Sequence, residues 1–170
     1  MRRNNIKALT FISLCVATLS VISQLAIPTG AVPLTLQVFV VALIGYFLKA
    51  KNGTLAVLVY ILLGVVGVPV FAGFQGGLGV LLGYTGGFIF GYIPFVLLCG
   101  VGKSKWQKIL FGICGLLLCH AVGVLQYMVL SHLGIWAAFI AVSLPFILKD
   151  IILVVCALAV SEIMEKRIKK

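Results

Sequence analysis

The chain has 170 residues, of which 63% are hydrophobic and 9% charged, and its mean hydropathy is +1.28. This composition is typical of a chain whose solvent is lipid, and it excludes an ordinary water-soluble domain. The formal charge of +10 comes from cations spread over four short segments beside apolar runs, which do not form one stripe with interleaved aromatic residues. Such cations favour contact with anionic lipid and argue against nucleic-acid binding.

Charges and turn-forming residues divide the sequence into six apolar runs. A bilayer core about 30 Å thick needs about 20 apolar residues per helix, and the runs lack the alternation of a membrane barrel. We therefore predict an all-helical integral membrane protein, a single domain over residues 1–170. Its six transmembrane helices are expected near residues 8–27, 34–49, 54–70, 84–102, 109–130 and 145–165. The first run is too long for a secretory signal core and lacks an A-x-A site, so we retain it as a span.

The connections between these runs alternate in charge. Twelve of the 13 Lys and Arg residues fall in the N-terminal segment, near residues 49–53, near residues 102–108 and in the C-terminal tail. The connections near residues 28–33, 71–83 and 131–144 contain none. The positive-inside rule therefore predicts that the basic connections and both termini are cytoplasmic.

Glycine is concentrated in the middle of the chain, where ten of the 19 glycines lie between residues 64 and 91. Residues 69–79 form an uncharged, glycine-rich stretch with two aromatic side chains, which suits neither a helix nor a polar turn. Irregular backbone near a membrane is tolerated where it is buried in protein or lines a cavity. The stretch is either a ligand-contacting loop or a structural cap. A row of glycines at every fourth position follows it and indicates close helix packing: Gly79, Gly83, Gly87 and Gly91.

Few residues are suited to catalysis. The three acids and two histidines form no G-x-S-x-G or H-E-x-x-H pattern, and the five cysteines form no C-x-x-C pair. Residues 102–104 (GKS) lack the first glycine and the preceding strand of a phosphate-binding loop. We therefore predict no enzyme activity, no metal and no ATP hydrolysis by this chain. His120, in the fifth run, is either a hydrogen-bonded packing residue or a site residue.

Asp150 is the only acid inside an apolar run, and Lys149 precedes it. An aspartate at mid-span costs roughly 2.5–3.5 kcal/mol on insertion scales, so such residues normally face a partner or a water-filled cavity. If Pro145 begins the helix, Asp150 lies about 7 Å from the outer end. Asp150 therefore lines an outward-facing pocket, or another helix holds it while Lys149 extends to the surface.

Several segments, in this order, resemble the BioY family: residues 32–37 (VPLTLQ), 67–73 (GVPVFAG), 76–77 (GG), 83–87 (GYTGG) and 144–146 (LPF) followed by Asp150. BioY proteins are the biotin-binding subunits of energy-coupling-factor transporters. The resemblance extends over residues 8–165. It implies six helices, an outward pocket roofed by loops, a bacterial inner-membrane location, and partnership with a transmembrane coupling subunit and two cytoplasmic ATPases.

Four positions depart from the family pattern. Tyr84 stands where the family's Gly-Pro-Thr/Ser-Gly-Gly has proline, and Gln75 stands where some members carry a basic residue. Leu153 replaces the usual lysine of Gly-Asp-x-x-Lys, while Lys149 stands just before the aspartate. Lys149 is therefore the available substitute for the missing cations.

The resemblance implies which site residues would contact each group of the ligand. Biotin has a cyclic urea, which needs both acceptors and donors, and a carboxylate, which favours a cation. Asp150 is expected to accept from the urea N–H groups, and Lys149 to hold the carboxylate. Further hydrogen bonds are expected from Gln37, Gln75 and Thr85, and apolar cover from Phe71, Phe74 and Tyr84. No cofactor is implied, because biotin is the transported ligand.

Small residues Ser13 and Ala17 stand four apart on the first span and form a candidate contact for the coupling subunit, although packing within the domain explains the spacing equally well. Three alternatives to biotin capture stay open. The first is a binding subunit of the same architecture for another vitamin. The second is a structural or channel-like subunit, against which the lack of a repeated ring of polar pore residues argues mildly. The third is an intramembrane enzyme, which lacks its catalytic set.

Overall fold

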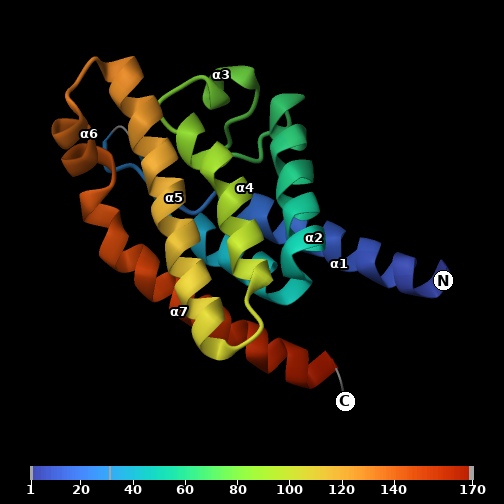
Figure 1. The fold of residues 1–170 in the computed structure, drawn as a ribbon. Coiled ribbons are helices and arrows are strands. Elements are labelled where there is room, and N and C mark those ends of the chain that lie inside the picture. The colour runs from blue at the N-terminus through green and yellow to red at the C-terminus, as the bar shows by residue number, and fades with distance from the viewer. Residues whose placement is uncertain (1, 31, 169–170) are drawn as a thin grey trace.

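The structure, a computed structural model, describes residues 2–30 and 32–168. Within them the chain forms helices and one small antiparallel hairpin (Figure 1). The elements are α1 (Arg2–Ile22), β1 (Ala26–Ile27), β2 (Leu34–Thr35), α2 (Gln37–Val65), α3 (Leu78–Leu81), α4 (Gly86–Val101), α5 (Lys105–Ser131), α6 (Ile135–Val142) and α7 (Leu144–Ile168).

Three helices of the described part are long and apolar enough to cross a membrane by length and composition: α2, α5 and α7. Shorter apolar helices occupy residues 6–22 of α1 and the whole of α4. The all-helical class predicted from composition is therefore confirmed.

The helix α2 consists of two arms that meet at Lys49, whose backbone is not helical (φ 64°, ψ 174°). A Cβ atom placed on Gly53 would lie 3.3 Å from Gly45 Cα, although eight residues of straight helix rise about 12 Å. The chain therefore turns back sharply between the arms, which fall in the predicted spans 34–49 and 54–70. A positive φ is uncommon for a non-glycine residue. Here the Lys49 ammonium donates to the carbonyl of Tyr46 (2.9 Å) and to the carboxylate of Glu165 (2.5 Å).

Other bounds differ from the predicted spans for local reasons. α1 ends at Ile22, five residues before the predicted end, because Ala26 and Ile27 pair with Thr35 and Leu34 in the hairpin. The second arm of α2 ends at Val65, and Gly67 then takes a positive φ of 97°. The short helices α3 and α6 lie inside segments expected to be loops.

Two glycines of the four-residue row bring α4 against α5. A Cβ on Gly87 would lie 2.6 Å from the carbonyl oxygen of Val122, and one on Gly91 would lie 2.7 Å from Cys119 Cα. Both contacts are closer than a real Cβ allows, so these positions need glycine. Gly79, in α3, meets nothing within 4 Å. The row therefore serves helix packing only in its second half.

The two ends of the bundle differ in character. α3 and α6 lie at one end in Figure 1, and the α4–α5 connection and the C-terminus lie at the other. At this second end, Tyr46 donates to the Lys108 carbonyl (3.1 Å) and Lys49 pairs with Glu165. The basic segments near residues 49–53 and 102–108 and the C-terminal tail therefore lie close together. The last two basic residues of the tail, Lys169 and Lys170, lie outside the described residues.

The GKS segment before α5 caps a helix. Ser104 Oγ accepts a hydrogen bond from the backbone N–H of Gln107 (3.2 Å), and the Gln107 side chain accepts from the backbone N–H of Ser104 (3.2 Å). This reciprocal pair is a capping box, which satisfies donors left free at the start of a helix.

Candidate functional site

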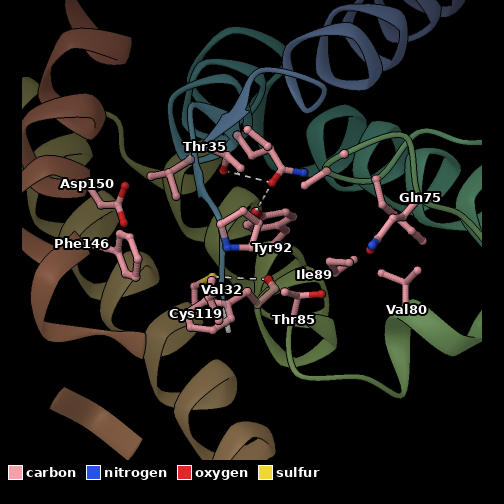
Figure 2. A pocket seen from close by; sticks show the side chains of 18 of the residues that line it. Val32, Thr35, Gln75, Val80, Thr85, Ile89, Tyr92, Cys119, Phe146 and Asp150 are labelled. Carbon is pink, nitrogen blue, oxygen red and sulfur yellow. Dashed lines mark hydrogen bonds between the residues drawn. The ribbon is translucent and has the colours of Figure 1, made fainter. Parts of the chain in front are cut away.

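A cavity of about 420 Å³ lies between the hairpin, the loop after α2, and the helices α2, α4, α5 and α7 (Figure 2). Its volume falls within the range of small-molecule sites in proteins. Its walls combine apolar side chains with a few polar ones. The residues that line it are Ala26, Pro28, Gly30, Val32, Pro33, Thr35, Gln37, Val38, Phe71, Ala72, Gly73, Gln75, Val80, Thr85, Phe88, Ile89, Tyr92, Cys119, His120, Phe146, Lys149 and Asp150.

Six of the eight binding residues predicted from the sequence line this one cavity: Gln37, Phe71, Gln75, Thr85, Lys149 and Asp150. They come from parts of the chain up to 113 positions apart (37 to 150), which only the fold brings together. Their contact with a ligand stays a prediction.

The other two predicted residues, Phe74 and Tyr84, do not line the cavity. The side chain of Phe74 is 72% exposed, and its backbone N–H donates to the Gln24 side-chain oxygen at 2.6 Å. Tyr84 packs against Tyr127 of α5, with ring centroids 5.3 Å apart. Each residue therefore contacts a neighbour outside the cavity. The aromatic residues Phe88 and Tyr92, which were not predicted, line the cavity instead.

The loop after α2 is irregular backbone that is fixed against the bundle. The Phe71 backbone N–H donates to the Gln75 carbonyl (2.9 Å), and the Gly77 N–H donates to the Gly64 carbonyl (2.6 Å). The Phe71 ring is buried and meets the Tyr60 ring edge-on, with centroids 5.6 Å apart. The loop therefore has the build of a structural cap, and its residues 71–73 and 75 also form part of the cavity wall.

One side of the cavity carries charge. Asp150 is 3% exposed, and its Oδ1 atom lies 2.7 Å from the Lys149 ammonium. Its Oδ2 atom lies 3.3 Å from Nε2 of His120, whose Nδ1 lies 2.9 Å from the hydroxyl of Ser143. Lys149 also donates to the carbonyl of Thr35 in β2 (2.9 Å). Lys149 and Asp150 therefore form an ion pair. Lys149 links α7 to the hairpin, and Asp150 links α7 to α5.

The Asp150 carboxylate is buried but keeps acceptor capacity. Its Oδ1 atom pairs with the Lys149 ammonium at 2.7 Å, and its Oδ2 atom lies 3.3 Å from His120 Nε2. Each carboxylate oxygen has two lone pairs, so the group can accept a further hydrogen bond from a bound molecule. Figure 2 shows Asp150 and Gln75 on opposite sides of the cavity, which has room between them.

A second polar group in the wall centres on Gln37. Its Oε1 atom accepts from the hydroxyl of Thr35 (3.0 Å) and from that of Tyr92 (3.3 Å), and its Nε2 atom donates to the hydroxyl of Tyr60 (3.0 Å). Tyr60 in turn donates to the Val70 carbonyl (3.0 Å). This group joins the hairpin, both arms of α2, α4 and the loop after α2.

Three polar cavity residues were not predicted to bind a ligand: Thr35, Tyr92 and His120. His120 has a visible signal, because it is the only titratable group other than cysteine and tyrosine in the fifth run, but this signal does not separate a packing role from a site role. Tyr92 stands in a continuous apolar run, so no local pattern separates it from a packing residue. Thr35 belongs to a two-residue strand that is too short to show a pattern.

The candidate coupling contact lies outside the cavity. Ser13 and Ala17 are both exposed on α1, and the N-terminal part of α1 projects beyond the other helices in Figure 1. Packing within the domain therefore does not account for the spacing of these two small residues.

Comparison with known proteins identifies the family. The family model described as "BioY family" matches residues 1–170. A probable biotin transporter BioY of Pyrococcus horikoshii is 41% identical over 157 residues, which cover 92% of this chain and 94% of the relative. A biotin transporter BioY of Thermotoga maritima is 42% identical over 161 residues, which cover 92% of each chain.

A solved structure shares the fold. The crystal structure of the S-component for biotin from an ECF-type ABC transporter matches with a TM-score of 0.90 over 98% of this chain and 94% of that one, at 23% identity. The family match over the full length and the two relatives above 40% identity show that this chain belongs to the BioY family.

Proposed function

We propose that the chain captures biotin in the described cavity and is the substrate-binding subunit of an energy-coupling-factor transporter. The observation that carries this proposal is the buried Asp150 carboxylate, paired with Lys149 at 2.7 Å, in the wall of a cavity of about 420 Å³. A cyclic urea supplies N–H donors to such an acceptor. Relatives named biotin transporters and a like-folded S-component for biotin support the same ligand.

The ion pair changes which group of the ligand each of the two charged residues is expected to contact. Asp150 and Lys149 lie 2.7 Å apart, so an extended ligand meets both at the same end. An ammonium has three N–H donors. One is used by the Thr35 carbonyl and one is directed toward Asp150, so a third can reach the urea carbonyl. Lys149 therefore belongs with the urea, in place of the carboxylate role suggested by the sequence.

The ligand carboxylate is then assigned to the opposite side of the cavity. Gln75 lies across from Asp150 in Figure 2, and its side-chain amide has N–H donors. Thr85 adds a hydroxyl to the same cavity. Phe71, Phe88 and Ile89 supply apolar surface for the ring and chain between the two polar ends. Neutral donors would hold the carboxylate in place of a cation.

The protein captures a ligand without catalysis, so energy must come from other chains. We assign that role to a transmembrane coupling subunit and two cytoplasmic ATPases. The exposed Ser13 and Ala17 on the projecting α1 form a surface that a coupling helix could approach closely.

The chain is assigned six spans in the plasma membrane, with both termini inside. α1, the two arms of α2, α4, α5 and α7 provide six helices. The basic segments that meet around Lys49, Lys108 and Glu165 support a cytoplasmic location for that end. The cavity then opens toward the outside.

A ligand panel tests the biotin assignment. Equilibrium binding to the purified chain in detergent is measured for biotin, biotinamide and a set of unrelated vitamins. We expect tight binding of biotin, and weaker binding of biotinamide, whose uncharged amide loses only the carboxylate contacts. Tighter binding of another vitamin would establish the alternative of a like-folded subunit with a different ligand.

A further inference from the structure

The hydrogen bonds around Gln37 form a directed network. The Val70 carbonyl can only accept, and the hydroxyls of both Tyr60 (3.0 Å) and Ser23 donate to it. With its proton directed to Val70, the Tyr60 oxygen accepts a hydrogen bond from the Gln37 side chain. The amide atom of Gln37 that faces Tyr60 is Nε2, the donor, at 3.0 Å.

With Nε2 directed at Tyr60, Gln37 presents its carbonyl oxygen to the other side. Oε1 lies 3.0 Å from the Thr35 hydroxyl and 3.3 Å from the Tyr92 hydroxyl. An amide oxygen only accepts, so both hydroxyls donate their protons to it. Either hydroxyl turned the other way would oppose two lone pairs inside a wall where Gln37 and Tyr92 are each 5% exposed.

We propose that Thr35 and Tyr92 are ligand-binding residues that act only as acceptors, and that Gln37 and Tyr60 are positioning residues that set this polarity. The inference rests on the proposed function, because it concerns the same cavity. Thr35 and Tyr92 both line the cavity, and Figure 2 shows them with the dashed hydrogen bonds that use their protons. Tyr60 is fully buried and does not line the cavity.

This wall selects for ligands rich in N–H groups. The Lys149 ammonium pairs with Asp150 and donates to the backbone carbonyl of Thr35, so Thr35 borders the charged side of the cavity. Thr35, Tyr92 and Asp150 all offer acceptors in the wall of this cavity, and Lys149 is its cation. A urea, with two N–H donors beside one carbonyl, matches that arrangement. A cyclic group without N–H donors would leave the acceptors unpaired.

The test uses biotin and its two isomers methylated on one urea nitrogen. A methyl group removes one N–H donor and adds bulk, so the affinity ratio of biotin to N-methylbiotin measures use of that N–H. We expect Thr35→Val and Tyr92→Phe each to weaken biotin by about 3- to 10-fold and to lower the ratio for one isomer. The methylated ligand loses less affinity in these variants, because it already lacks the N–H group that the deleted hydroxyl would accept from.

Tyr60→Phe tests the positioning role from outside the cavity. Without the tyrosine hydroxyl, Nε2 of Gln37 loses its acceptor and the two cavity hydroxyls are no longer forced to donate to Oε1. The ratio should fall in the same direction as in Tyr92→Phe. The matched control is Tyr46→Phe, which also removes a fully buried hydroxyl, one bonded to the Lys108 carbonyl at the other end of the bundle. The control should leave the ratio unchanged.

The outcomes separate this inference from the proposed function. Failure of the wild-type chain to bind biotin overturns both. If the wild-type chain binds biotin while Thr35→Val and Tyr92→Phe leave both ratios unchanged, the acceptor assignment is wrong and biotin capture stands. A ratio that falls in Tyr92→Phe but equally in Tyr46→Phe overturns the directed network, because any buried hydroxyl would then have the same effect.

Discussion

At the residue scale, ligand affinity depends first on Asp150. The substitution Asp150→Asn keeps the shape but turns one acceptor oxygen into a donor and leaves Lys149 without its carboxylate. Losing a hydrogen bond to a buried charged group costs on the order of 1.5–3 kcal/mol, roughly a 10- to 150-fold loss of affinity. We expect that loss for biotin and biotinamide alike. Glu162→Gln makes the same chemical change twelve positions along α7, outside the cavity, and should leave equilibrium binding unaltered.

Lys149 distinguishes two ligand orientations. Lys149→Met keeps most of the apolar stem and removes the ammonium that pairs with Asp150. If the lysine belongs to the urea end, the variant weakens biotin and biotinamide by the same factor, and the ratio of their affinities does not change. A selective loss of biotin over biotinamide would instead place the ligand carboxylate on Lys149, and the ligand would have to be reversed or folded back in the cavity.

The residues of the cavity differ in how far sequence alone predicts them. Asp150 and Lys149 are charges inside an apolar run, a local signal strong enough to select them. Tyr92 and Thr35 give no such signal, because an aromatic residue in a span and a threonine in a connection are ordinary. Phe74 and Tyr84 are aromatic residues that the resemblance suggests as apolar cover for the ligand, but neither lines the cavity, and Phe74 takes a positive φ of 60°. Side-chain direction in irregular backbone depends on tertiary contacts that a sequence pattern does not show.

At the scale of the elements, the α4–α5 contact is set by glycine. Gly91→Ala places a Cβ atom 2.7 Å from the backbone of Cys119, so the helices must separate, at a cost of about 1–3 kcal/mol. Gly79→Ala belongs to the same four-residue row but meets open space in α3, and we expect a change within about 0.5 kcal/mol. Thermal unfolding of the two variants in detergent would measure the difference. Equal losses would mean that the close approach of α4 and α5 does not limit stability.

The first helix provides a test of the coupling surface. Replacing Ser13 and Ala17 together by Leu should weaken co-purification with a coupling subunit, because the added volume keeps a partner helix at a distance. Biotin binding should stay nearly intact, since neither residue lines the cavity. Ala137 and Ala141 on α6 are also exposed and four apart, so their double replacement by Leu is the matched control. Unchanged co-purification of the Ser13 and Ala17 variant would remove this face from consideration.

Helix positions followed from the sequence more closely than helix ends. Apolar run length predicts α4, α5 and α7 to within a few residues, because lipid demands a continuous apolar stretch. The sharp turn at Lys49 and the early end of α1 depend on contacts between distant segments, namely the Lys49–Glu165 pair and the pairing of β1 with β2. These contacts do not appear in the local composition.

At the scale of the whole molecule, the topology follows from the placement of the cations. In a cysteine-free background, single cysteines at Lys51 and Lys105 should be shielded from an impermeant thiol reagent added outside intact cells. A cysteine at His132 should react, because this residue ends α5 at the opposite end of the bundle and is exposed. Labelling at Lys51 or Lys105 would reverse the assigned orientation.

Native mass measurement of the purified chain shows whether this cavity holds biotin. The chain is purified from cells grown with biotin, and the mass of the gently ionised protein is compared with the mass after unfolding. We expect an added mass of one biotin per chain, lost on unfolding and strongly reduced in Asp150→Asn. A retained molecule of different mass, or no retained mass even after biotin is added to the purified chain, would contradict biotin capture.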